Sequence, residues 1–140
     1  MSIEDPKAIV QMQGDNVFIV TTPSGHSIKL DTDHVRNSAP TPMELLLVAL
    51  GFCTAVDVVS ILRKKRQDVA DYRVEVRGER REEHPRSFQR MEVHHIVTGR
   101  SVSEQSVAQA IELSEQKYCS VAATLRPTAA IVSSYEIIEG

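Results

Sequence analysis

The fold is decided by residues 41–67, which read TPMELLLVALGFCTAVDVVSILRKKRQ. Thr41 fits a helix N-cap, Pro42 fits the first helical position, and Glu44 stands three residues after the cap, as a capping box requires. The run RKKR near the end places positive charge where it suits the negative pole of a helix dipole. The pattern predicts one long helix.

Apolar residues cover nearly every face of this predicted helix. They are Leu45, Leu46, Leu47, Val48, Ala49, Leu50, Phe52, Ala55, Val56, Val58, Val59, Ile61 and Leu62. A helix that is apolar all round is normally buried all round. One chain of 140 residues has little material to cover it. We therefore expect a partner, most simply a second copy of the chain.

Short strands are predicted before the helix. Residues 8–13 and 16–22 flank a turn at Gly14-Asp15, which is a strong hairpin signal, and residues 26–30 form a third strand. The polar stretch 31–40 is expected to be a loop, on the surface or over a site.

Longer elements are predicted after the helix. Strands at 72–81 and 88–98 are joined by a charged loop. In the second of these strands one side alternates with the other: Met91, Val93, His95 and Val97 against Glu92, His94 and Ile96. A second helix spans 103–118, capped by either Ser101 or Ser103. It is amphipathic, and its stripe is formed by Val107, Ala110, Ile111 and Ser114. A short turn or helical piece follows at 119–125. A strand at 128–138 closes the chain. The order βββ-α-ββ-α-β is an α+β pattern, in a single domain of residues 1–140.

Composition excludes several classes of protein. Hydrophobic residues make up 41% and charged residues 25%, which is ordinary for a globular domain and unlike disordered or collagen-like chains. The net charge of −3 and the absence of Trp disfavour a nucleic-acid partner. The first fifteen residues lack a signal-peptide core, and the apolar stretch 45–59 is too short and interrupted to span a membrane. With only two cysteines, we expect a cytoplasmic protein without structural disulfides.

The two cysteines, Cys53 and Cys119, are the candidate reactive groups. Free cysteines are often small buried hydrophobes, and spacing alone favours that interpretation. Cys53 lies mid-helix, beyond reach of the helix dipole, so it needs a nearby cation or hydrogen-bond donor to become a thiolate. Cys119 precedes a predicted helical piece that starts at Ser120, where free backbone N–H groups could stabilise a thiolate.

Two motifs resemble one known family. The segment TPMELLLVALGFCTA, residues 41–55, resembles the long central helix of the OsmC/Ohr family, the osmotically inducible protein C and organic hydroperoxide resistance proteins. The segment KYCSVAAT, residues 117–124, resembles the second-cysteine segment of that family. The order of elements also matches, and the OsmC-like subgroup is the most similar. The resemblance implies an intertwined homodimer with two long helices at its centre.

The resemblance also implies an activity. Well-studied members are thiol peroxidases that reduce organic hydroperoxides without a cofactor. Cys53 matches the peroxidatic cysteine, which becomes a sulfenic acid, and Cys119 matches the resolving cysteine, which condenses with it to a disulfide. An external dithiol, a lipoylated protein in the best-studied members, would restore both thiols.

The sequence departs from the peroxidases at two supporting positions. Aligned on Pro42 and Cys53, the family's Glu falls on Met43, with Glu44 one position later. On an ideal helix, Glu44 lies about 180° around and about 13.5 Å along the axis from Cys53, so it could serve a site only across subunits. A role in the capping box is the ordinary interpretation.

The family's hairpin Arg is also missing. The corresponding region, residues 13–16, contains no cation, and Arg36 in the following loop could replace it. A solvated loop Arg is the ordinary interpretation.

Other polar residues give weaker signals. Asp57 lies one helical turn after Cys53, where a carboxylate opposes thiolate formation unless it faces a basic partner. His94 and His95 are adjacent on a strand and point to opposite faces, and no metal site is expected. Two further functions stay open on the same scaffold: a non-catalytic protein that binds a small apolar molecule between subunits, and a redox sensor.

Overall fold

The computed structural model describes residues 7–140. The expectation that residues 1–15 contain no signal-peptide core falls partly on residues 1–6, which lie outside the described part. The chain forms two compact units, the first ending at Leu46 and the second comprising residues 47–140. Helix α1, Pro42–Lys64, begins in the first unit and continues through the second.

The first unit contains an antiparallel sheet with the strand order β1-β2-β3. Its strands are β1 (Ile9–Gly14), β2 (Val17–Thr21) and β3 (Ser27–Asp31), within two residues of the predicted bounds. The first hairpin turns at Asp15-Asn16, one residue after the predicted Gly14-Asp15, and Asn16 adopts a left-handed φ of 60° there. Asn tolerates this conformation better than most residues, which explains how so tight a turn forms.

The capping box predicted for α1 is present. The Thr41 N–H donates to Glu44 Oε1 at 2.9 Å, and the Glu44 N–H donates to Thr41 Oγ1 at 3.3 Å. The helix ends three residues before the predicted Gln67, because Arg66 takes a left-handed φ of 58°. The Arg66 and Gln67 N–H groups then bond back to the carbonyls of Arg63 and Leu62, which is a Schellman motif.

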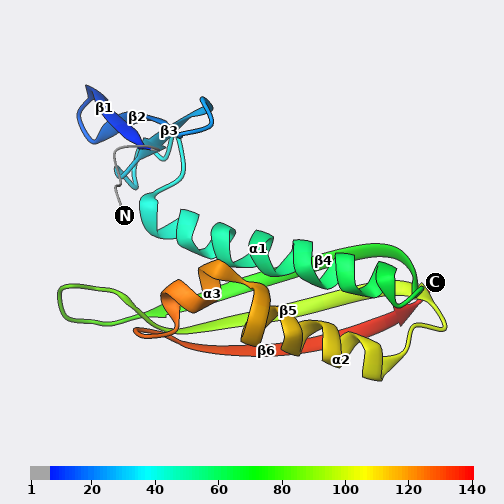
Figure 1. The fold of residues 1–140 in the computed structure, drawn as a ribbon. Coiled ribbons are helices and arrows are strands. Elements are labelled where there is room, and N and C mark those ends of the chain that lie inside the picture. Colours follow the sequence, from blue (N-terminus) through cyan, green and yellow to red (C-terminus); the bar gives the residue numbers. More distant parts are fainter. Residues whose placement is uncertain (1–6) are drawn as a thin grey trace, which may run out of the picture. The chain divides into compact units, whose positions relative to one another are not determined.

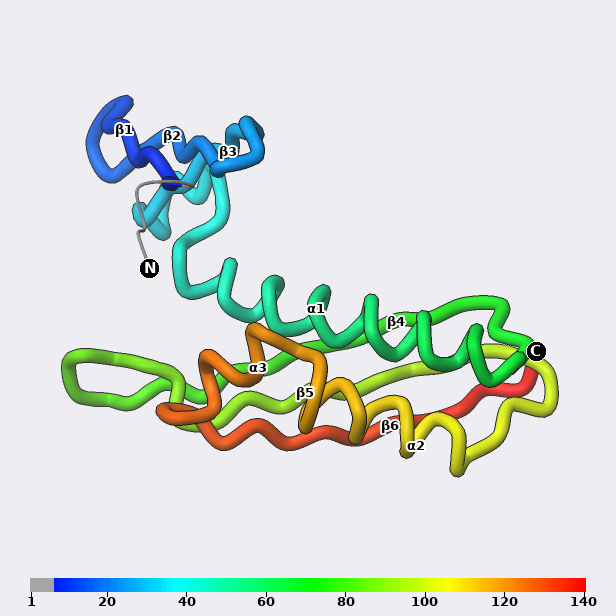
Figure 2. Tube along the Cα trace, viewed as in Figure 1, coloured from blue at the N-terminus to red at the C-terminus, as the bar shows by residue number. Residues whose placement is uncertain are grey.

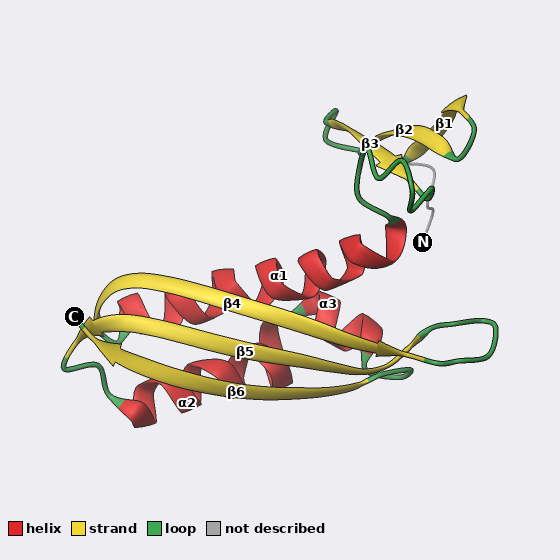
Figure 3. Ribbon diagram, turned by 180° about the vertical axis from the view of Figure 1, so that it is seen from behind, coloured by secondary structure: helices red, strands yellow, loops and turns green. Residues whose placement is uncertain are grey.

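The second unit is a three-stranded sheet covered on one face by helices. Strands β4 (Asp68–Arg80) and β5 (Phe88–Arg100) form an antiparallel hairpin, and β6 (Ala130–Glu139) pairs with β5 in parallel. Helices α1, α2 (Glu104–Leu113) and α3 (Ser120–Leu125) all lie on the same side of this sheet (Figures 1 and 3). The α+β fold predicted from the sequence is confirmed.

The core of the second unit lies between this sheet and the helices. Its buried members come from α1, β5 and α2: Val58, Leu62, Val97, Val107, Ala110 and Ile111. The predicted alternation along β5 is confirmed, because Met91, Val93, His95 and Val97 are all buried. Ser103 is the N-cap of α2, since its Oγ accepts from the Ser106 N–H at 3.2 Å.

The second predicted helix is not continuous. After α2 the chain forms a π-helical turn, Ser114–Tyr118, before α3 begins. The Cys119 N–H closes this turn on the Ser114 carbonyl at 2.7 Å. Figure 2 shows the path from α2 through this turn into α3, along one side of the sheet. A π-helical turn contains one more residue than an α-helical turn, so the 3.6-residue periodicity used to predict the helix did not indicate it.

Helix α1 is buried along one side only in the single chain. Leu62 on the inner side is fully buried, whereas Phe52 on the outer side is 71% exposed and Val48 and Val56 are also exposed. The expectation of burial on every side is therefore met for one face. Helix α1 is long and apolar enough to cross a membrane, whereas from the sequence we expected this stretch to be too short. Core helices of soluble proteins meet the same criterion of length and composition.

Candidate active site

The two cysteines, far apart in sequence, meet in the second unit. Cys53 lies in the middle of α1, and Cys119 lies between the π-helical turn and α3. Both are free thiols, and the Cys53 side chain lies near enough to Cys119 to raise the pKa of the Cys119 thiol. The structure therefore brings together the two sulfurs that the sequence singled out.

Cys119 is held as a protonated thiol. It is only 3% exposed, and its Sγ accepts from the Ala122 N–H at 3.3 Å as the N-cap of α3. Burial raises the pKa of Cys119 to about 11, and the Cys53 side chain adds to this effect. The N–H groups of Ala122 and Val121 oppose it. The expected donors are thus present, but burial outweighs them and no thiolate is favoured at Cys119.

Cys53 is the more accessible sulfur. Its side chain is half-buried, because the neighbouring outer face of α1 is open in the single chain. The two sulfurs therefore have unequal environments, as different chemical roles would require.

A polar cluster that the sequence did not predict lies beside the cysteines. Thr54 Oγ1 and Ser114 Oγ are 2.9 Å apart in a buried contact, and Ser114 Oγ donates to Asp57 Oδ2 at 2.8 Å. Asp57 therefore accepts a hydrogen bond from a hydroxyl at the position where the sequence left open a basic partner. The only sequence signal for Ser114 was a small hydroxyl residue on the apolar stripe of the second helix.

Glu44 and Arg36, the two possible supporting residues, make local contacts in the first unit. Glu44 is engaged by the capping box with Thr41. Arg36 forms a bidentate pair with Asp31, with Nε–Oδ2 at 2.9 Å and Nη2–Oδ1 at 2.8 Å. The Arg36 guanidinium, together with Ser38, holds the pKa of Asp31 well below its usual range. These contacts match the structural interpretation of each residue.

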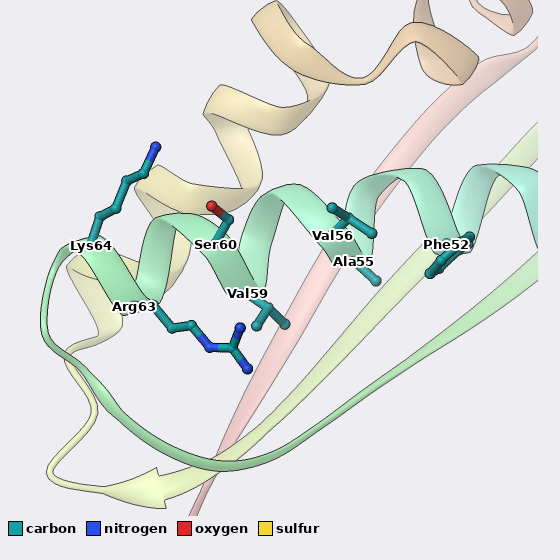
Figure 4. A pocket seen from close by; sticks show the side chains of 7 residues that line it. All are labelled: Phe52, Ala55, Val56, Val59, Ser60, Arg63 and Lys64. Atoms are coloured by element: carbon teal, nitrogen blue, oxygen red, sulfur yellow. The ribbon is translucent and has the colours of Figure 1, made fainter.

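An open apolar groove runs along α1 on the exposed side. It encloses about 510 Å³, and Figure 4 shows its lining side chains along this one helix. Phe52, Val56 and Val59 give it an apolar floor, and Arg63 and Lys64 place positive charge at one end. Phe52 at one end of the groove is the direct chain neighbour of Cys53, but Cys53 itself does not line the groove.

The histidines have separate structural environments. His94 Nδ1 and Ser134 Oγ are 2.7 Å apart, whereas His95 is fully buried and its Nδ1 is hydrogen-bonded to the Tyr72 hydroxyl. The two side chains therefore point to opposite faces of the sheet, as predicted. Burial lowers the pKa of His95 to about 4, with His94 contributing, so His95 is neutral near pH 7. Within residues 7–140, no group of His, Cys, Asp or Glu is arranged to hold a metal ion.

Comparison with known proteins identifies the family. The family described as OsmC-like protein matches residues 35–134. Protein YhfA of Escherichia coli strain K12 is 49% identical over 121 residues, which cover 86% of this chain and 90% of YhfA.

Solved structures agree with this result. A hypothetical protein of Aquifex aeolicus is 34% identical, with a TM-score of 0.86 over 99% of each chain. The organic hydroperoxide resistance protein OsmC of Legionella pneumophila is 15% identical, with a TM-score of 0.71 over 97% of this chain and 99% of that chain. The latter likeness shows the fold alone. From the matched segment and the close relatives, the chain belongs to the OsmC-like protein family.

Proposed function

We propose that this protein is a thiol peroxidase that reduces organic hydroperoxides with Cys53 and Cys119. The observation that carries the proposal is the proximity of the two cysteine side chains, one half-buried and the other enclosed and protonated. Family membership supports it, as does the fold shared with an organic hydroperoxide resistance protein. No cofactor enters this chemistry.

Cys53 is the attacking sulfur in this proposal. Its thiolate attacks one oxygen of the hydroperoxide, so that an S–O bond forms as the O–O bond breaks. The leaving alkoxide takes a proton and departs as an alcohol, and Cys53 becomes a sulfenic acid. Two electrons pass from the sulfur to the peroxide.

Cys119 resolves the intermediate. Its sulfur attacks the Cys53 sulfenic sulfur, an S–S bond forms, and the hydroxyl leaves with the Cys119 proton as water. A dithiol, such as a lipoylated protein, then reduces the disulfide by two exchange steps and becomes a disulfide itself. The buried, protonated state of Cys119 suits this role, because its thiol is shielded from oxidants until Cys53 has reacted.

Variants of the two cysteines test the proposal. Reduced protein should consume an alkyl hydroperoxide and a fatty-acid hydroperoxide with dithiol turnover. Cys53→Ser should abolish the reaction, and Cys119→Ser should accumulate a sulfenic acid on Cys53 that a dimedone adduct reports by mass. No turnover of either peroxide by the reduced wild-type protein would reject the enzyme proposal.

A homodimer is the proposed assembly. The exposed apolar side of α1, formed by Val48, Phe52 and Val56, is the supporting observation, since such a stripe is normally covered in a soluble protein. Sedimentation of the wild-type protein should give twice the chain mass. Val48→Asp should shift the protein towards the monomer, whereas an unchanged sedimentation coefficient would argue that this face is not the interface.

We also propose a cytoplasmic location, where thiols stay reduced.

One observation favours a second candidate function on the same scaffold. Arg36 is paired with Asp31 and Glu44 with Thr41, so neither supporting residue is free within its own chain. A non-catalytic protein that binds a small apolar molecule, or a redox sensor, needs neither residue. Native mass spectrometry that shows a retained ligand together with inert thiols would favour the binding protein over the peroxidase.

A further inference from the structure

Ser114 makes hydrogen bonds in two directions from one buried position. It is fully buried, and its hydroxyl lies between Thr54 and Asp57 of α1. A serine hydroxyl carries one proton, and here that proton goes to the Asp57 carboxylate. The Thr54 hydroxyl must therefore donate to Ser114, which gives a directed chain from Thr54 through Ser114 to Asp57.

The main chain of Ser114 is bonded to the other cysteine segment. Its carbonyl accepts the Cys119 N–H at 2.7 Å and so closes the π-helical turn. Its hydroxyl binds Thr54, the residue that directly follows Cys53 in α1. One residue thus connects the backbone of Cys119 to the helical turn that carries Cys53.

The π-helical register itself requires support. In an ordinary α-helix the Cys119 N–H would bond to the Glu115 carbonyl, four residues earlier. That carbonyl instead accepts a hydrogen bond from Arg126 at the end of α3. Because each α-helical residue turns the chain by about 100°, a return to the α register would rotate Cys119 away from Cys53.

We propose that Ser114 is a positioning residue, anchored by Thr54 and Asp57, that fixes the π-helical turn and thereby holds Cys119 against Cys53. The proposal deepens the proposed function and rests on it for the use of the cysteine pair. Its measurable consequence is the equilibrium between the two thiols and their disulfide. A mispositioned Cys119 lowers the effective concentration of one sulfur at the other, and the disulfide becomes easier to reduce.

The experiment equilibrates the protein with mixtures of reduced and oxidised dithiothreitol. Closing the protein disulfide releases two electrons and two protons, which reduce the oxidised reagent to its dithiol. The fraction of Cys53–Cys119 linked peptide, measured by mass after acid quenching, gives the equilibrium constant. We expect Ser114→Ala to lower this constant about tenfold, the usual effect of losing a hydrogen bond to a charged group.

A pair of substitutions at Thr54 separates positioning from packing. Thr54→Val keeps the shape of the side chain but removes the hydroxyl, and we expect it to lower the constant by about threefold. Thr54→Ser keeps the hydroxyl and should restore the wild-type constant, although it removes a buried methyl group. This pair keeps the inference testable if Ser114→Ala does not fold.

Ser103→Ala is the matched control. It removes another serine hydrogen bond of the second unit, the N-cap contact to the Ser106 N–H, at the far end of α2 from the cysteines. We expect a loss of stability without a change in the disulfide equilibrium.

Three results would overturn the inference: a Ser114→Ala constant within about twofold of wild type, equal constants for Thr54→Val and Thr54→Ser, or no linked peptide in wild type. Because no peroxide is used, the positioning result does not depend on turnover. A protein that forms the disulfide normally but consumes no hydroperoxide would reject the peroxidase proposal and leave the role of Ser114 intact.

Discussion

The two units of the chain differ in the interactions that stabilise them. In the second unit, α1, β5 and α2 contribute fully buried side chains such as Leu62, Val97 and Val107. Within residues 7–46, Val17 is the only buried apolar side chain, and Val10 on β1 is 63% exposed. The first unit relies instead on polar contacts around the buried Asp31. The comparison shows that a sheet can be ordered locally while its apolar side chains still lack cover.

The largest expected effect is on the core of the second unit. Leu62→Ala removes a fully buried side chain and should lower the free energy of unfolding by about 3 kcal/mol. Val10→Ala removes exposed surface and should cost less than about 0.5 kcal/mol in the isolated chain. Urea unfolding of both variants measures the contrast. Equal losses would mean that β1 is covered in solution by a partner, and dilution would then weaken the Val10 effect.

The two units should lose stability at different pH values when the solution is acidified. His95 has a pKa of about 4 in the folded protein and about 6.5 when unfolded, so the unfolded chain takes up the proton first. The neutral His95 side chain therefore contributes about 3 kcal/mol to the free energy of unfolding. This contribution is complete above pH 6.5 and is lost as the pH falls through 4. The pKa of Asp31 is lowered from 3.8, so the first unit should respond only below that pH.

Unfolding free energies measured between pH 7 and 4 test this assignment. His95→Gln keeps a group that can bond to the Tyr72 hydroxyl and should flatten the curve across this range. If the wild-type and His95→Gln curves keep the same slope, His95 is not the group that titrates.

The most localised expected effect is confined to the first unit. Asp31→Asn removes the charge that pairs with Arg36 and weakens the contacts to Ser38. Hydrogen exchange at the Asp33 and Ser38 amides should become faster, because both donate to the Asp31 carboxylate. Exchange in β5 should stay unchanged. A single cooperative unfolding transition in this variant that involves both units would support the predicted single domain of residues 1–140.

Much of the fold followed from local chemistry. The reciprocal bonds of Thr41 and Glu44 were predictable because capping depends on residues three positions apart, and for the same reason the sequence narrowed the cap of α2 to Ser101 or Ser103, of which the structure uses Ser103. The alternation along β5 and the stripe on α2 were predictable because apolar periodicity records which face is buried. The sequence placed the end of α1 and the start of β4 less well, since Arg66 adopts a left-handed conformation that its residue type does not signal.

The sequence by itself determined the element types and order, the two capped helix starts and, through resemblance, the two cysteines to examine. Only the tertiary structure decided that these two cysteines come near one another, that burial keeps Cys119 protonated, and that Ser114 connects their segments. The physical reason is the distance along the chain over which each kind of interaction acts. Caps and periodicity act within a few residues, whereas burial and contacts between α1 and the π-helical turn depend on groups that only the folded chain brings together.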